Sequence, residues 1–192
     1  MSFVTSAAFS PDSRRIAYNK DQGVTIVDVT SGSTVNQFPF MMASSVEYSP
    51  DGKELLVAGD KTLRLINPDS DQLIATMTDT RGPLFAAIFS PDGKYIISGA
   101  GSNIRVWDAD THVAIGDLKG GYGTISDLGI SADDRRIVAN NFVGGGLWPG
   151  PAEWPDLLCN RLIHNMSDKQ WNEWVEPDIP YELACPDLPK AG

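Results

Sequence analysis

The sequence predicts an all-β fold built from repeated units, followed by a short helical and proline-rich tail. Three observations predict it: a Ser-Pro-Asp tripeptide returns at a nearly constant spacing, short apolar segments alternate with turn-forming residues, and the composition changes near residue 150. Before that point no segment has helical periodicity, so most of the chain is expected to form strands and turns.

The tripeptide occurs four times, the last time in degraded form. Its copies begin at Ser10, Ser49, Ser90 and Ser131, at intervals of 39, 41 and 41 residues. Proline after serine fixes φ for a turn, and the Asp-Gly or Asp-Ser that follows supplies a tight corner. A period of about 40 residues indicates a repeat architecture in which each unit packs against its neighbours.

Each unit has its strands in the same order. An apolar strand precedes the turn, a second strand follows it, and a third lies further along the chain. In the first three units a fourth strand follows the third. The residue directly before each serine is expected to be buried between units: Phe9, Tyr48, Phe89 and Ile130. The position 17 residues after each serine holds Val27, Ile66, Trp107 and Trp148, so four copies keep one register.

Four antiparallel strands in 40 residues correspond to one blade of a β-propeller. The predicted fold is therefore an all-β, partial propeller with a helical, proline-rich extension at residues 150–192. Its fourth blade is incomplete, because no outer strand follows Trp148-Pro149. The four blades fall at about residues 3–40, 41–80, 81–121 and 122–149 of the propeller segment 1–149.

Four blades are few for a closed ring, so the first and last blades are expected to expose apolar faces that drive association. Three explanations stay open. The chain is the C-terminal part of a longer protein or a truncated product, it pairs with a second copy, or an unrelated chain caps it. The first is favoured. Because Met1 directly precedes the first strand, no N-terminal segment is expected to complete the last blade.

The third copy carries the most specific motif. Residues 89–108 contain Phe-Ser-Pro-Asp-Gly-Lys-x-Ile-x-Ser-Gly and then Ile-Arg-Val-Trp-Asp, which resembles a WD40 repeat. The resemblance covers roughly residues 3–149, and the other copies match less fully. It implies that these residues are structural repeat positions: Asp12, Asp51, Asp92, Asp133, Trp107, Asp108 and Trp148.

The copies depart from the WD40 pattern in two ways. The Gly-His pair that usually precedes the first strand is missing, and the usual aspartate before the third strand, present as Asp21 and Asp60, is replaced by Gly101 and Phe142 in the later copies. The Asp–His–Ser–Trp network of such blades is therefore expected to be mostly absent, and stability is expected to rest on apolar packing between neighbours.

The resemblance implies a non-enzymatic protein-interaction module, acting as a scaffold or sensor, whose partner the sequence does not name. The alternative is a TolB-like or peptidase-associated propeller that belongs to an enzyme. That alternative needs clustered acids and histidines, whereas the two histidines, His112 and His164, have no metal-ligand spacing. No catalytic, cofactor-binding or metal-binding residue is predicted, and no cofactor.

Composition narrows the partners and the compartment. The net charge is −10 and no basic stripe accompanies it, which argues against nucleic acid. No apolar run approaches the roughly 18 residues of a membrane helix, and the first residues do not resemble a signal peptide. A cytoplasmic protein without membrane contact is expected.

The tail differs from the repeats. Pro155 and Asp156 are expected to open a helix whose apolar face carries Leu158, Leu162 and Met166, and a second helix is expected to carry Trp171 and Trp174. The tail resembles the extension that closes many bacterial WD40 proteins, often large signalling chains with a kinase or NTPase part. Trp154, Trp171 and Trp174 either bind a partner or, as is favoured, pack the tail against the last blade.

The two cysteines, Cys159 and Cys185, lie in this tail. The tail resemblance includes both positions, and their spacing permits a disulfide without requiring it. Because a reducing cytoplasm disfavours disulfides, free buried thiols are the favoured expectation.

Overall fold

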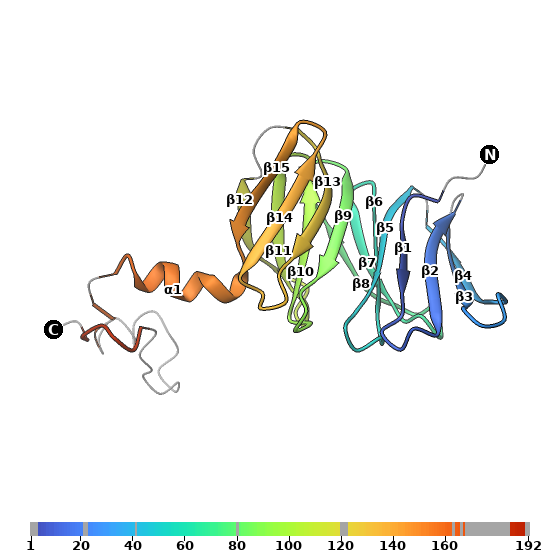
Figure 1. The fold of residues 1–192 in the computed structure, drawn as a ribbon, viewed down its shortest axis with the longest axis horizontal. Coiled ribbons are helices and arrows are strands. Elements are labelled where there is room, and N and C mark those ends of the chain that lie inside the picture. Colours follow the sequence, from blue (N-terminus) through green and yellow to red (C-terminus); the bar gives the residue numbers. More distant parts are fainter. Residues whose placement is uncertain are drawn as a thin grey trace.

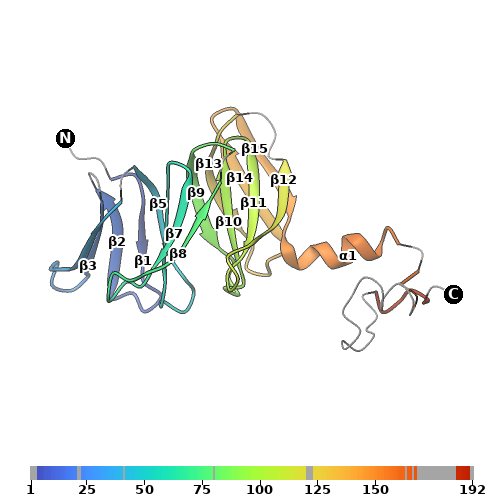
Figure 2. The ribbon, with the colours of Figure 1, turned by 180° about the vertical axis from the view of Figure 1, so that it is seen from behind.

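The computed structural model describes residues 4–20, 23–40, 42–79, 81–119, 123–162, 164–165, 167 and 185–190. It contains four antiparallel sheets that follow one another along the chain and stand side by side, with a short helix beyond the last (Figure 1). The same succession is visible from behind (Figure 2). The fold is mainly strand, as the sequence predicts.

Each sheet is an antiparallel meander of consecutive strands, and we number the sheets 1 to 4 in chain order. Sheet 1 contains β1 (Ala7–Phe9), β2 (Arg15–Lys20), β3 (Gly23–Asp28) and β4 (Thr34–Pro39). Sheet 2 contains β5 (Ala43–Tyr48), β6 (Leu55–Gly59), β7 (Thr62–Ile66) and β8 (Leu73–Thr78). Sheet 3 contains β9 (Leu84–Phe89), β10 (Tyr95–Ala100), β11 (Asn103–Asp108) and β12 (Ala114–Lys119).

Sheet 4 has three strands, β13 (Ile125–Ile130), β14 (Arg136–Asn141) and β15 (Gly144–Pro149). The expectation of an incomplete last unit is therefore confirmed. Beyond β15, where the other sheets have a fourth strand, the chain turns into the 3-10 helix η1 (Pro151–Glu153) and helix α1 (Trp154–Cys159).

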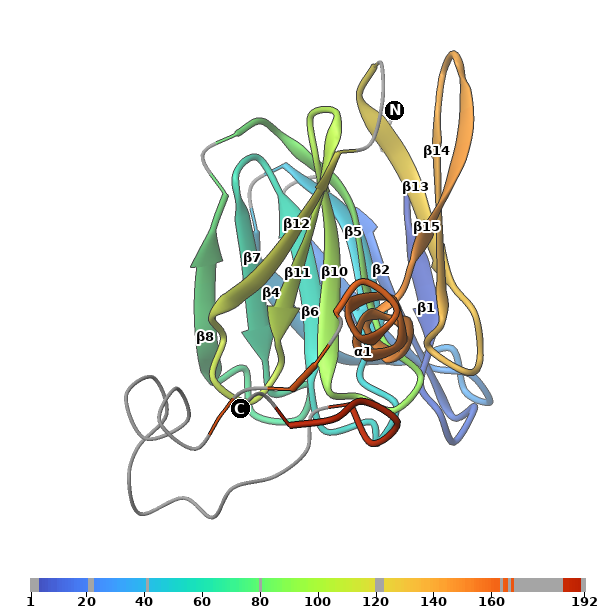
Figure 3. The same ribbon diagram turned by 90° about the vertical axis from the view of Figure 1, so that its left-hand side faces the viewer.

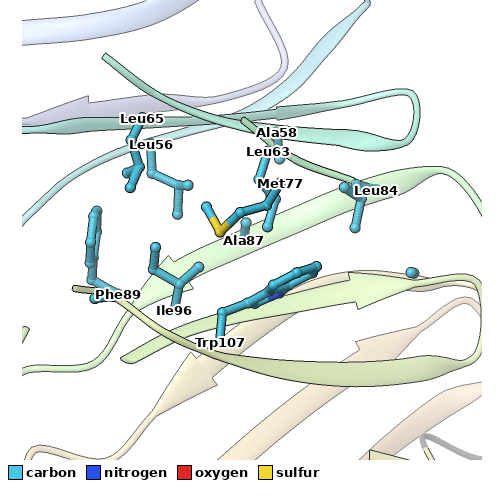
Figure 4. Packing of buried hydrophobic residues seen from close by; sticks show 12 residues of the cluster. Leu56, Ala58, Leu63, Leu65, Met77, Leu84, Ala87, Phe89, Ile96 and Trp107 are labelled. Carbon is cyan, nitrogen blue, oxygen red and sulfur yellow. The ribbon is translucent and has the colours of Figure 1, made fainter. Parts of the chain in front are cut away.

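The core lies between successive sheets as three apolar clusters. Sheet 2 shows how one sheet serves two of them, because side chains alternate between its faces. Leu55 and Val57 pack toward sheet 1, whereas Leu56 packs toward sheet 3. Between sheets 2 and 3, Met77 and Trp107 point toward one another (Figure 4). The strands are therefore apolar on both faces, as stacked blades require.

The residue before each serine is buried in some sheets but not in all of them. Tyr48 and Phe89 are 6% and 4% exposed, and Ile130 is partly buried. Phe9 is 62% exposed, so its expected burial is wrong. The reason is topological: the equivalents of Phe9 face a preceding sheet, and none of the described residues forms a sheet over this face of sheet 1.

The tail helix is shorter than the apolar spacing predicts. Helix α1 ends at Cys159, and Leu158 and Leu162 are 63% and 49% exposed. Arg161 and Leu162 after the helix are not helical, and further on the side-chain amide of Asn165 donates to the carbonyls of Cys185 and Leu188, each at 2.7 Å. Met166 and the second expected helix lie outside the described residues.

A disulfide joins Cys159 and Cys185, whose Cα atoms are 5.4 Å apart. The favoured expectation of free thiols is therefore wrong. The bond is supported by Asn165, whose Oδ1 accepts the backbone N–H of Cys185 at 2.9 Å. Asn165 and the disulfide together fix Cys185 next to the end of α1, an arrangement that the cysteine spacing alone does not require.

Candidate interaction surface

We call the first strand of each sheet, β1, β5, β9 and β13, its innermost strand, because these strands contact one another from sheet to sheet. The aspartates of the tripeptides hold the turns that follow these strands. Ser49 Oγ donates to Asp51 Oδ1 at 2.8 Å, the Lys53 N–H donates to the same oxygen at 3.0 Å, and the Glu54 N–H donates to Ser49 Oγ at 3.0 Å. The same three bonds recur around Asp12, Asp92 and Asp133. Their carboxylates are therefore engaged by their own turns.

Hydrogen bonds to these carboxylates lower their pKa. Asp51, held by the side chain and backbone N–H of Lys53 and by Ser49, has its pKa lowered to about 2. The pKa of Asp12 and of Asp133 is lowered by the neighbouring serine hydroxyl and a backbone N–H. In Asp92 the hydrogen bonds from Lys94 and Ser90 outweigh burial, which acts in the opposite direction, and its pKa is also lowered. The four groups are charged at neutral pH.

The Trp-Asp pair of sheet 3 also has local partners. The buried Trp107 Nε1 donates to Ser98 Oγ, which lies on the neighbouring strand β10, at 2.9 Å. Asp108 Oδ1 accepts the N–H and hydroxyl of Thr111, both at 2.7 Å, and so caps the turn before β12. At the Ser98 position the other sheets carry Tyr18, Val57 and Ala139, so this Trp–Ser bond is confined to sheet 3 among the repeats.

Trp148 of β15 and Trp154 of α1 both pack against β12, the last strand of sheet 3. Trp148 Nε1 donates to the Lys119 carbonyl of sheet 3 at 2.8 Å, and Trp154 Nε1 donates to the Pro149 carbonyl at 3.1 Å. The Trp154 ring lies against Gly116 of β12, so tightly that a Cβ at Gly116 would come within 2.8 Å of it. Both rings join the cluster between sheets 3 and 4. Trp171 and Trp174 lie outside the described residues.

A surface with exposed apolar side chains lies at one end of the innermost strands. We call it the apolar rim and define it by Met42, Phe85, Phe142 and Val143, which are 71%, 45%, 93% and 81% exposed. They line a pocket of about 680 Å³ together with small polar residues of sheets 1, 2 and 4. The tip of the β14–β15 hairpin, which carries Phe142, stands at this end (Figure 3).

A second concave region lies at the opposite, Ser-Pro-Asp end of the innermost strands. It is a groove of about 510 Å³ whose lining includes Phe9, Leu128 and the partly buried Glu47. Burial raises the pKa of Glu47 to about 7, against the opposing effect of the Phe89 N–H, which donates to Glu47 Oε2 at 3.2 Å. Through this hydrogen bond Glu47 links sheets 2 and 3, so its carboxyl group is not an unpaired group of the groove.

Within the described residues, no group of three or more His, Cys, Asp and Glu side chains is placed to hold a metal ion. Nor is any helix in these ranges long and apolar enough to cross a membrane. His112 lies in the β11–β12 turn with a φ of +60°, at the turn capped by Asp108. His112 is therefore a residue of this turn.

Sequence reasoning missed the apolar rim. One signal was present: Phe142 and Val143 occupy a hairpin turn, where polar residues are normal. Met42 and Phe85 gave no comparable signal, because each lies in or beside a strand that is apolar for packing reasons. Only the stacking of the sheets brings these four residues to one pocket.

Comparison with known proteins identifies the repeat. The WD40 family model, described as WD domain, G-beta repeat, matches residues 41–67 and 68–108. These residues comprise sheet 2 and the first three strands of sheet 3. A search of curated proteins found no match. WD40 repeats are typically non-catalytic interaction domains, and the antiparallel blade-like sheets agree with that architecture. Residues 41–108 therefore contain WD40 repeats, and the sheets around them are consistent with a β-propeller-like fold.

Proposed function

We propose that this chain is a non-enzymatic protein-interaction module, a scaffold or sensor, that binds its protein partner through the apolar rim. The observation that carries the proposal is the exposure of Phe142 and Val143 in a hairpin turn beside Met42 and Phe85. Exposed apolar side chains gathered around one pocket mark interaction sites, and Phe and Met are enriched at the centre of protein interfaces.

The rim also has the construction of a binding surface. Its side chains come from sheets 2, 3 and 4, and their backbones are held by strands whose opposite ends are fixed by the serine–aspartate turns. The small polar residues Thr5, Ser44 and Ser126 line the same pocket. An apolar centre with polar surroundings is the usual anatomy of a protein–protein interface.

We further propose that the module is cytoplasmic and works as part of a larger bacterial signalling protein. Support comes from the resemblance of the tail to the extension of bacterial WD40 proteins. The Cys159–Cys185 disulfide argues in the other direction, because such bonds persist mainly in oxidising compartments. The proposed cytoplasmic location is tested by the redox state of the two cysteines in the protein isolated from its native cells. A stable disulfide in that protein would contradict a location in a reducing cytoplasm.

The rim is tested by a photo-crosslinking amino acid at Phe142. The matched control carries the same group at Val113, which is 58% exposed but lies in the β11–β12 turn. A partner captured from position 142 and not from position 113 is then purified and titrated against the wild-type chain and against Phe142→Asp and Val113→Asp.

We expect Phe142→Asp to weaken binding by at least about tenfold, a loss of about 1.4 kcal/mol, as for an interface hot spot. Val113→Asp should leave the affinity unchanged. Equal binding by wild type and Phe142→Asp would show that the partner uses another surface.

A further inference from the structure

The contact between successive sheets repeats with the sequence. Side chains at offsets 6, 8 and 17 from each tripeptide serine face the preceding sheet: Leu55, Val57 and Ile66 of sheet 2 pack on sheet 1. The same offsets in sheet 1 hold Ile16, Tyr18 and Val27. With Phe9, they form a face that we call the leading face. None of the described residues covers it with a sheet, and Phe9 is 62% exposed there.

The opposite face of each sheet repeats equally well. Offsets 7 and 16 hold Ala17 and Ile26 in sheet 1, Leu56 and Leu65 in sheet 2, and Ile97 and Val106 in sheet 3. All six are at most 1% exposed, because the following sheet covers them. In sheet 4 the same offsets hold Val138 and Leu147, which are 50% and 66% exposed. They define the trailing face.

One polar contact between sheets 1 and 2 has its two positions exposed at the ends of the array. In sheet 1, Asn19 donates from Nδ2 to the Ala43 carbonyl at the start of sheet 2, at 2.6 Å. The residue of sheet 4 at the Asn19 offset is Asn140, which is exposed. The residue of sheet 1 at the Ala43 offset is Val4, which is 53% exposed. One end of the array thus carries the donor of the inter-sheet contact, and the other end carries its acceptor position.

We propose that the trailing face of one copy docks on the leading face of a second copy, as a continuation of the sheet-on-sheet packing within the chain. The two faces differ from each other, and each repeats one side of an interface that the chain already forms three times. The association is therefore head-to-tail. Such contacts close into a ring when the rotation allows it and otherwise extend as a filament.

Helix α1 does not occupy the position that this docking requires. It starts after the end of β15 and extends away from the sheets toward the C-terminus (Figure 1). Its first turn is held to the β13–β14 turn by an ion pair between Arg135 and Asp156, and the ring of Trp154 packs toward sheet 3. The helix thus borders the trailing face, and a docked copy would lie beside it.

The test uses the full chain and two variants, Phe9→Asp on the leading face and Leu147→Asp on the trailing face. Leu73→Asp is the matched control, because Leu73 is 53% exposed on β8 in the middle of the array. Sedimentation velocity at micromolar concentration should show wild type and Leu73→Asp as dimers or larger species, and each end variant alone as a monomer. An equimolar mixture of the two end variants should form a one-to-one dimer, since each retains one intact face.

A second measurement does not depend on disrupting the surface. A chain with Asn140→Cys and Val4→Cys should form an intermolecular disulfide on mild oxidation, whereas Asn140→Cys with Leu73→Cys should not. A monomeric wild-type chain would overturn the proposal. A mixture of the two end variants that stays monomeric would also overturn it. The same holds if only one of the two variants abolishes dimerisation, because either result means that the two faces do not pair with each other.

Discussion

The serine–aspartate pair of each turn performs one structural task four times. The aspartate accepts a hydroxyl and a backbone N–H, and the serine accepts the N–H that opens the next strand. The next residue adopts a positive φ, which favours glycine: Gly52 and Gly93 have φ +75°, but Ser13 and Asp134 adopt the same region at +59° and +57°. The outer copies therefore carry backbone strain that the inner copies avoid.

The turn carboxylates make the fold sensitive to acid. Asp51 has a folded-state pKa of about 2 against an ordinary value of 3.8, so its contribution to stability is present above pH 4 and is lost as the pH falls toward 2. We expect the urea midpoint to fall steeply over this range. Asp51→Asn should lower the midpoint at pH 6 and make the profile flatter below pH 4. An unchanged slope in this variant would contradict the assignment.

Ser98 is the partner that keeps the buried Trp107 N–H satisfied. Ser98→Ala leaves that donor without an acceptor inside the core, which should lower the free energy of unfolding by about 1–3 kcal/mol. Ser70→Ala is the control, because Ser70 is exposed in the β7–β8 turn. Urea denaturation measures both, and equal stability of the two variants would show that the Trp107 bond contributes nothing.

At the scale of elements, the strands were predictable and the tail was not. The repeat aligned four copies, so that alternating apolar residues and turn residues placed β10 and β11 directly from residues 89–108. In the tail, the apolar spacing of Leu158 and Leu162 indicated a helix past residue 160. The helix ends at Cys159 instead, and Asn165, on the expected continuation, bonds to residues 185 and 188, far along the chain. Such tertiary bonds leave no local pattern.

The position before each tripeptide serine carries phenylalanine in sheets 1 and 3, but the two side chains differ in burial. Phe89 is 4% exposed and its equivalent Phe9 is 62% exposed. Phe89→Ala should lower the free energy of unfolding by about 3–5 kcal/mol, as for a core aromatic, whereas Phe9→Ala should change it by less than about 1 kcal/mol in the monomer. Denaturation at low protein concentration measures both. A large loss for Phe9→Ala would mean that its face is covered.

The disulfide belongs to the tail and spans 26 residues outside the sheets. The double variant Cys159→Ser, Cys185→Ser should therefore leave the thermal transition of the sheets unchanged while the tail is cleaved faster in limited proteolysis, because its ordering no longer has a covalent constraint. Thiol alkylation without reductant should label neither cysteine of the wild-type chain. Lower stability of the sheets in the double variant would show that the tail supports them.

For the whole molecule, the fold could be predicted more fully than the candidate site. Periodicity reports which faces of a strand are apolar, and so it predicts stacked sheets. It does not report which apolar residues stay uncovered: Met42 and Phe142 are 100 positions apart and meet only because the sheets stack at a particular rotation. The end faces belong with the fold, since the small number of blades predicts their exposure and the repeat offsets predict their composition.

The titration of Glu47 and the titration of the turn aspartates change the stability of the whole array in opposite directions, and together they set the pH at which it is greatest. Glu47, between sheets 2 and 3, has its pKa raised by burial from 4.5 to about 7. Its stabilising effect is complete below pH 4.5 and is lost as the pH rises through 7, with a total of at most about 3 kcal/mol. The turn aspartates act in the other direction below pH 4, so stability should be greatest between roughly pH 4 and 5.

Glu47→Gln keeps an acceptor for the Phe89 N–H and removes the charge. The variant should have a flat stability profile from pH 5 to 8 and should exceed the wild type at pH 8, because the wild type must bury a carboxylate there. Asp133→Asn is the matched control: it should change the acid limb and leave the limb from pH 5 to 8 as in the wild type. Urea midpoints across this range measure both limbs, and a wild-type profile that stays flat between pH 5 and 8 would show that Glu47 ionises freely between the sheets.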